Sequence, residues 1–243
     1  MLKATFALLF ALPFALMPPA FSEASVATPP GRVEGAAQTN TQHVYRTLTL
    51  QPGGTLRLKT FSGRVRITGG AGNQVVIKAV RRAKQDRLDD IKLEISQNGN
   101  TIEVDANHRV VERRNDNVVE TDFEIQVPVS TRLDLKTFSA PVTVIDVNAD
   151  QNIDGFSSSI TVESSEWADH DLDINTFSGG VRLRLPASAR GNIDFNSFSG
   201  TFESDLPVTL NNSNRRNFRG ALNGGGAGDF KLKTFSGDVQ IRK

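Results

Sequence analysis

Leu56-Arg-Leu-Lys-Thr-Phe-Ser-Gly-Arg-Val-Arg-Ile67 is one copy of a segment that returns along the whole chain, and this repetition decides the fold. Four other copies share its Thr/Ser-Phe-Ser core, and a degenerate one keeps Phe-Ser alone. They occupy residues 133–144, 172–183, 193–202 and 230–241, with the degenerate copy at 153–160. Internal repeats of this length indicate one small unit that is stacked many times.

The phase of the repeat places its residues on two faces. Residues two apart in a strand face the same side, so Leu56 and Leu58 share a face and Lys59 lies on the opposite one. After the Phe-Ser-Gly element the alternation resumes with Val65 and Ile67. The element therefore predicts a corner between two strands whose apolar sides look inward. Glycine suits such a corner because it accepts positive φ and has no Cβ.

The spacing of the phenylalanines favours a solenoid. Phe156, Phe177 and Phe198 are 21 residues apart, and a unit of two or three short strands uses about that length. We predict an all-β, single-stranded, right-handed β-helix-like stack of ~21-residue repeats. Its core would contain a phenylalanine ladder with rings about 4.8 Å apart. The ladder residues are Phe61, Phe138, Phe156, Phe177, Phe198 and Phe235.

Two intervals interrupt the spacing. The one between Phe61 and Phe138 would hold three or four divergent units, and residues 211–228 would form a polar excursion loop. Lys84 to Ile91 predicts a turn or a single helical turn. Two antiparallel β sandwiches are the alternative fold, because alternating strands with frequent turns also suit that class.

Three segments divide the chain. Residues 1–24 predict a signal peptide, with Lys3 before an apolar run and small residues at the cleavage site. A retained membrane anchor is the alternative, but the run is shorter than a spanning helix needs and Pro13 interrupts it. Residues 25–43 predict a flexible lead-in, and 44–243 the repeat domain. We expect an exported protein, periplasmic or secreted, with no transmembrane segment in the mature chain.

The composition excludes several classes of site. The formal net charge of 243 residues is +1, so no strong field selects nucleic acid. We also find no strip of alternating basic and aromatic residues of the kind that single-stranded nucleic acid requires. The absence of cysteine excludes disulfides, thiolate metal sites, a cysteine nucleophile and a lipoprotein anchor.

Metal sites are weakly indicated. Asp169, Asp171 and Asp173 have the spacing to share one face of a strand and bind Ca²⁺. Their apolar neighbours indicate that they are simply an outward face. Residues 224–229 are similar to a calcium β-roll repeat, but their spacing differs and the segment occurs once, which favours a loop. We therefore predict no metal and no cofactor.

Catalysis is also weakly indicated. His43, His108 and His170 are scattered, and the corner serine recurs with every copy, which indicates a structural role. β-Helix enzymes that act on polysaccharides use carboxylates of one outer face, for which Asp146 and Asp150 would be candidates. Nothing singles out this pair, so we predict no catalytic residue.

A polar stripe on the outer face is the candidate for ligand binding. If the units stack in register, its residues form a row of donors spaced for a repeating or extended ligand, such as an envelope polysaccharide or another envelope protein. The alternative is that they keep the outer face soluble. The stripe consists of Lys59, Lys136, Asn175, Asn196 and Lys233.

The repeats resemble the bacterial β-strand-repeat "putative adhesin" family, a group of extracytoplasmic proteins with a domain of unknown function. The resemblance covers about residues 44–243 and rests on the copies at 133–139, 172–181 and 230–241 and on Phe123-Glu-Ile-Gln-Val-Pro128. It implies a β-solenoid-like fold in a cell-envelope setting and no catalytic residues. The degenerate copy lacks the glycine, and Ala140-Pro141 replaces it in the second copy.

These observations predict a non-enzymatic, extracytoplasmic, adhesin-like binding or scaffold module of the cell envelope, of undetermined oligomeric state. One alternative is a carbohydrate-active β-helix enzyme, which would show a groove with converging carboxylates. Another is an extracytoplasmic partner in an envelope-stress response, which the sequence leaves open.

Overall fold

The computed structural model describes residues 39–109, 118–211, 214 and 216–243. Residues 37–243 form one compact unit. The predicted signal peptide 1–24 lies outside the described residues, as does the predicted lead-in up to residue 38. The described part of the chain is built from β-strands and one short helix, α1 (Gln85–Asp90), which matches the expected helical turn.

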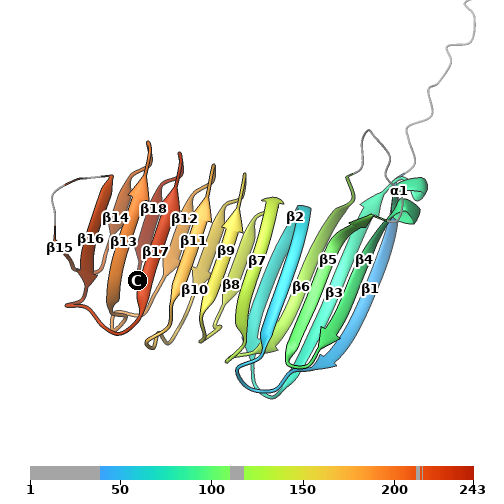
Figure 1. Cartoon of the computed structure of the whole chain (residues 1–243), viewed down its shortest axis with the longest axis horizontal. Helices are drawn as coiled ribbons and strands as arrows, with labels where there is room; N and C mark the ends of the chain where they lie inside the picture. The colour runs from blue at the N-terminus through green and yellow to red at the C-terminus, as the bar shows by residue number, and fades with distance from the viewer. Residues whose placement is uncertain (1–38, 110–117, 212–213, 215) are drawn as a thin grey trace, which may run out of the picture. The chain divides into compact units, whose positions relative to one another are not determined.

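The strands that precede each corner stack side by side in one row (Figure 1). Their pairing is parallel. In spatial order the row consists of β5 (Thr101–Arg109), β2 (Thr55–Gly70), β7 (Arg132–Ser139), β9 (Gln151–Gly155), β11 (Leu172–Thr176), β17 (Asp229–Thr234) and β13 (Gly191–Ser197).

The strands that follow each corner form a second parallel row. In order these are β6 (Glu120–Pro128), the second half of β2, β8 (Val142–Ile145), β10 (Ile160–Glu163), β12 (Val181–Arg184), β18 (Val239–Arg242) and β14 (Phe202–Ser204). A single chain thus passes from one row to the other at each Phe-Ser element. The predicted β-solenoid is confirmed, and two separate sandwiches are not formed.

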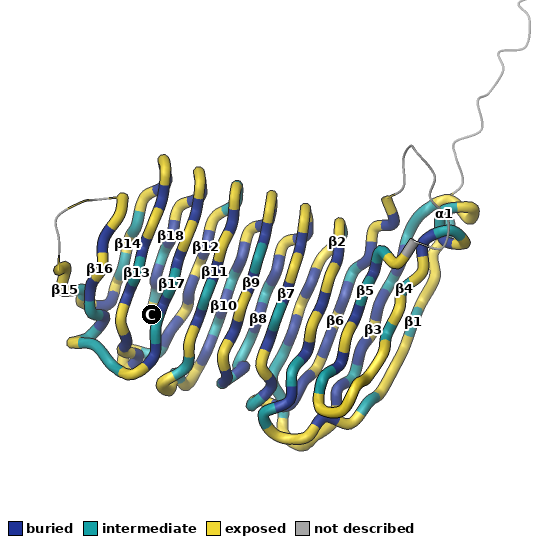
Figure 2. Tube along the Cα trace, viewed as in Figure 1, coloured by how far each residue is buried: buried dark blue, intermediate teal, exposed yellow. Residues whose placement is uncertain are grey.

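One apolar core lies between the two rows, as the alternation predicts. Leu56 and Leu58 before the first corner and Val65 and Ile67 after it are completely buried in the same cluster. Figure 2 shows this alternation as bands of buried residues along the strands, with the tips of the corners exposed.

The order of the strands in space differs from their order in the sequence. The last unit, β17–β18, lies between the unit of β11–β12 and the unit of β13–β14. The first unit, β2, pairs directly with β7 and β8. The prediction of three or four units between Phe61 and Phe138 is therefore wrong. Residues 74–128 instead form strands beyond β2, which continue the sheet past the first repeat.

The strands beyond β2 are mostly antiparallel. β1 (Asn40–Thr49) pairs with β3 (Gln74–Ala83), which pairs with β6, while β4 (Ile91–Asn98) forms a hairpin with β5. The first strand begins at Asn40, so residues 40–43 of the predicted lead-in belong to β1. The buried Arg81 connects this end, because its guanidinium donates to the side-chain oxygen of Gln42 and to the carbonyl of Ile91.

The other end of the stack corrects the predicted excursion loop. Part of it is β16 (Asn217–Leu222), which pairs antiparallel with β13 and with β15 (Val208–Leu210). Phe218, Gly220 and Leu222 alternate inward and are buried. The neighbouring arginine and glycine residues hide this period-two signal in the sequence.

Two corner glycines show why the motif needs this residue. Gly63 and Gly179 have φ of +108° and +147°. A Cβ on Gly179 would lie 2.2 Å from the carbonyl oxygen of Ser158 in the next unit, and one on Gly63 would lie 2.1 Å from that of Thr121. Neighbouring corners therefore stack too closely to admit a side chain here.

Candidate functional site

The six repeat phenylalanines form a continuous row of stacked rings on the outside of the corners. Neighbouring ring centroids are 4.5–5.0 Å apart and the ring planes deviate by 3–9°. The predicted ladder is present, but its order follows the strands in space. From one end to the other it is Phe61, Phe138, Phe156, Phe177, Phe235 and Phe198.

The rings are not part of the core, which corrects the prediction. Their exposed fractions run from 38% for Phe61 to 67% for Phe198. The reason is the strand period: Phe61 is two residues after Lys59 and shares its outward phase, whereas Thr60 takes the inward position. The same parity was visible in the sequence and could have placed the rings outside.

Hydroxyl groups hold the corners in register beneath the rings. Thr137 donates from Oγ1 to Oγ of Ser158 at 2.9 Å, and Thr234 lies 3.0 Å from Oγ of Ser197. Ser158 belongs to the degenerate copy, where Gly155 replaces the threonine. A Cβ on Gly155 would lie 3.0 Å from Cβ of Ser158, so this serine fills the space and supplies the hydroxyl that the copy lacks.

The predicted polar stripe forms one row across adjacent strands, two residues before the rings. All five of its residues are exposed, and the strand pairing brings them into register with one further side chain, Asp154. Sequence reasoning missed Asp154 because its copy is degenerate. In spatial order the row is Lys59, Lys136, Asp154, Asn175, Lys233 and Asn196.

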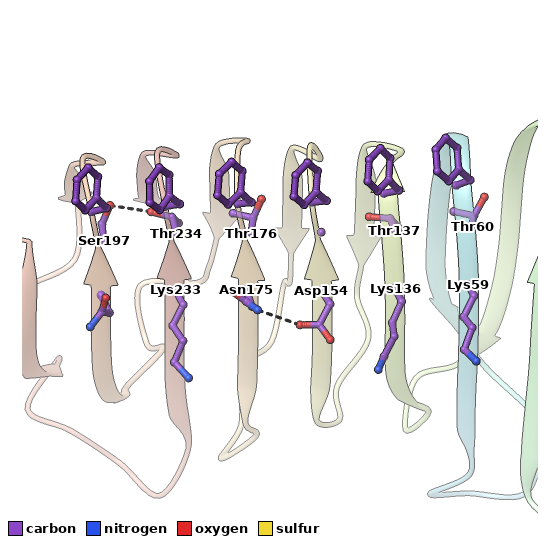
Figure 3. Close-up of a pocket in the computed structure, with 18 of the residues that line it drawn as sticks. Lys59, Thr60, Lys136, Thr137, Asp154, Asn175, Thr176, Ser197, Lys233 and Thr234 are labelled. Carbon is purple, nitrogen blue, oxygen red and sulfur yellow. Dashed lines mark hydrogen bonds between the residues drawn. The ribbon is translucent and has the colours of Figure 1, made fainter. Parts of the chain in front are cut away.

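The ring row and the polar row together line one open depression of about 1030 Å³. Figure 3 shows the rings side by side above the buried threonine and serine residues, with the lysines extending away from them. Asp105, Asn107 and Asn217 complete the lining at the two ends. We call this surface the ladder groove.

The lysines of the ladder groove have few partners. Within the described residues, no carboxylate oxygen lies within 4.0 Å of the amino group of Lys59, Lys136 or Lys233. The two carboxylates of the groove have hydrogen-bond partners of their own. Asp154 accepts from the amide of Asn175 at 3.5 Å, and Asp105 accepts from the backbone N–H of Asn107 at 2.8 Å.

The next outward row, two residues further from the rings, behaves differently because it contains ion pairs. Arg57 lies 3.0 Å from Glu103 and 3.6 Å from Asp134. Arg219 lies 3.1 Å from Asp194 at the far end. Charges in this row are matched by their neighbours, whereas those of the ladder groove are left for solvent or a ligand.

The other candidate residues stay apart from the groove. Asp171 accepts from the backbone N–H of Asp229 at 3.0 Å, and Asp150 accepts from that of Asp171 at 3.2 Å. Asp146 accepts from the backbone N–H and hydroxyl of Ser165, each at 2.8 Å. These carboxylates stabilise turns. Across the described ranges no group of three His, Asp or Glu side chains is placed to hold a metal ion.

Comparisons with known proteins bear on the fold. Residues 117–242 match the family model described as Toastrack DUF4097. No curated protein matches the chain. A solved structure titled a "putative cell adhesion protein" from Clostridium sporogenes ATCC 15579 superimposes with a TM-score of 0.61 at 13% identity. The match covers 83% of this chain and 99% of that one.

A "putative adhesin" from Bacteroides fragilis NCTC 9343 matches with a TM-score of 0.32 at 10% identity, over 82% of this chain and 97% of that one. At such identities the likeness to the clostridial protein concerns the fold. Within the described residues, no helix is long and apolar enough to cross a membrane.

Proposed function

The chain belongs to the Toastrack DUF4097 family, and from this premise we propose that it is a non-enzymatic, adhesin-like binding module of the cell envelope. We propose further that it is exported by the segment 1–24 and that residues 44–243 act as one binding domain. The names of the two structural neighbours, an adhesin and a cell adhesion protein, support this proposal.

The ladder groove carries the proposal. Six strand ends repeat the same pair of an outward ring and an outward polar side chain, so the groove presents one chemistry along its whole length. Repetition at a spacing of 4.5–5.0 Å suits an extended ligand, which contacts several units at once. Many weak contacts of this kind add up because the strands hold them rigidly in place.

The arrangement of carboxylates supports a role without catalysis. Hydrolysis of a glycosidic bond needs two carboxyl groups that face each other across the substrate. Asp105 and Asp154 both line the groove, but the strands that carry Lys59 and Lys136 lie between them. They stand in one row of the same face, so a substrate would lie on both of them and would not lie between them.

Binding of the purified protein to peptidoglycan, to a glycan array and to anionic lipid vesicles tests the proposal, with product analysis of every glycan. We expect saturable binding without turnover. Lys233→Gln should weaken it several-fold, whereas Lys231→Gln, on the same strand and face but outside the groove, should leave it unchanged.

Cleaved glycan would replace the proposal with the enzyme alternative. Equal effects of the two lysine substitutions would show that the ligand binds elsewhere. Cell fractionation checks export independently, because deletion of residues 1–24 should retain the protein in the cytoplasm.

A further inference from the structure

The stacked arrangement of the rings restricts what the ladder groove can bind. Each inner ring has a ring neighbour on both faces, with planes 3–9° from parallel. Nucleobases and cations are bound by the open face of an aromatic ring, and here those faces are covered. The sugar rings of a polysaccharide would likewise find no open platform. What the row presents to solvent is the C–H edges of its rings.

These edges form a narrow apolar strip without a polar interruption. Five intervals of about 4.8 Å give it a length of roughly 24 Å. With the rings about half exposed, and roughly 200 Å² for each phenylalanine, the strip exposes on the order of 500 Å². That area is at the upper end of what a soluble monomer leaves uncovered, and such patches mark binding sites. One ring in width and six in length, the strip has the dimensions of a single linear hydrocarbon chain.

The charges beside the strip select the head group. Lys59 and Lys136 are directly paired residues of neighbouring strands, and like charges opposite each other destabilise a sheet. Neither amino group has a carboxylate within 4.0 Å among the described residues. An anion between them would relieve their repulsion. This lysine pair lies near one end of the strip, beside Phe61 and Phe138.

We infer that the ladder groove binds a single-chain anionic amphiphile, with the acidic head at Lys59 and Lys136 and the acyl chain along the rings toward Phe198. The inference rests on the proposed function, because it names the ligand of the same groove. From Phe138 to Phe198 the row spans four intervals, roughly 19 Å. A long-chain fatty acid covers this distance, whereas a chain of eight carbons covers about half of it.

Equilibrium dialysis with radiolabelled palmitate below its micellar concentration tests the inference on the purified full chain. Octanoate and hexadecyltrimethylammonium serve as competitors. Palmitate should bind at one site and outcompete octanoate, with affinity rising about twofold per added methylene, half the effect of full burial because the groove stays open. The cationic competitor of equal chain length should be weaker.

Matched variants separate the head from the chain. The double variant Lys59→Gln and Lys136→Gln should weaken palmitate about fivefold, the upper range for exposed charges, and Lys231→Gln should leave it unchanged. Phe177→Ser should weaken binding by interrupting the strip, whereas Phe177→Leu should retain it. Thermal melts of each variant show that the fold is intact.

Several results would overturn the inference. Equal affinity for the anionic and cationic chains would remove the role of the lysines, and equal affinity for octanoate and palmitate would remove that of the rings. Binding to phosphatidylglycerol vesicles without binding of monomeric palmitate would point to a membrane surface. If palmitate fails but a glycan binds and is lost in Lys233→Gln, the proposed function stands and this inference is wrong. If no ligand depends on the groove, both are wrong.

Discussion

Substitution of a single corner glycine should destabilise the stack more than most changes in its core. Gly179 has φ of +147°, and a Cβ there would lie 2.2 Å from the carbonyl oxygen of Ser158 and 2.5 Å from its carbon. Holding alanine in that backbone conformation costs about 1–3 kcal/mol. The overlap with backbone atoms cannot be relieved by a side-chain rotation, so the neighbouring unit has to shift.

That shift would strain the ladder on both sides of the corner. The N–H of Ile160 donates to the carbonyl of Gly180 at 2.9 Å, and the N–H of Ser178 donates to that of Phe156 at 2.8 Å. Weakening one such bond costs about 1 kcal/mol. Together these effects predict a loss of about 3–5 kcal/mol for Gly179→Ala.

Thermal or urea denaturation followed by circular dichroism measures the effect. For a domain of this size such a loss lowers the melting temperature by about 10 °C. Gly180→Ala is the matched control, because a Cβ on Gly180 would meet its nearest atom at 3.7 Å. We expect it to change stability by less than about 0.5 kcal/mol. Equal melting temperatures for the two variants would refute the reasoning about close stacking.

Three further predictions concern the same units. Phe177→Ala should cost about 2 kcal/mol in chemical denaturation, since the ring is half exposed, against about 4 kcal/mol for the buried Ile174→Ala; equal losses would place the ring in the core. Ser178→Ala should leave ligand binding within twofold, because this serine does not line the groove; lost binding would contradict its structural role. Hydrogen bonds from the N–H and hydroxyl of Thr201 hold the pKa of Asp238 below its usual value of 3.8, so its stabilising effect is complete above that pH and is lost as the pH falls through the lower folded-state pKa. Asp238→Asn should therefore flatten the acid limb of the stability profile, and an unchanged limb would argue against these bonds.

The sequence was most informative where residues alternate. Leu56, Leu58, Val65 and Ile67 are completely buried as the period predicted, because side-chain direction in a strand is a local property. The polar stripe was predicted to be outward for the same reason, and its residues do line one groove. The burial of the rings was predicted wrongly, although Phe61 has the same parity as Lys59.

What the sequence by itself determined is the unit: two short strands, a corner that requires glycine, and the face on which each side chain lies. Only the tertiary structure decided the order in which units stack, and with it the position of Asp154 in the polar row and of Phe235 between Phe177 and Phe198. The physical reason is that every unit offers nearly the same strand edges and the same apolar face. Pairing between such similar edges is not encoded in any one copy, and it is settled when the ends of the chain find their neighbours in space.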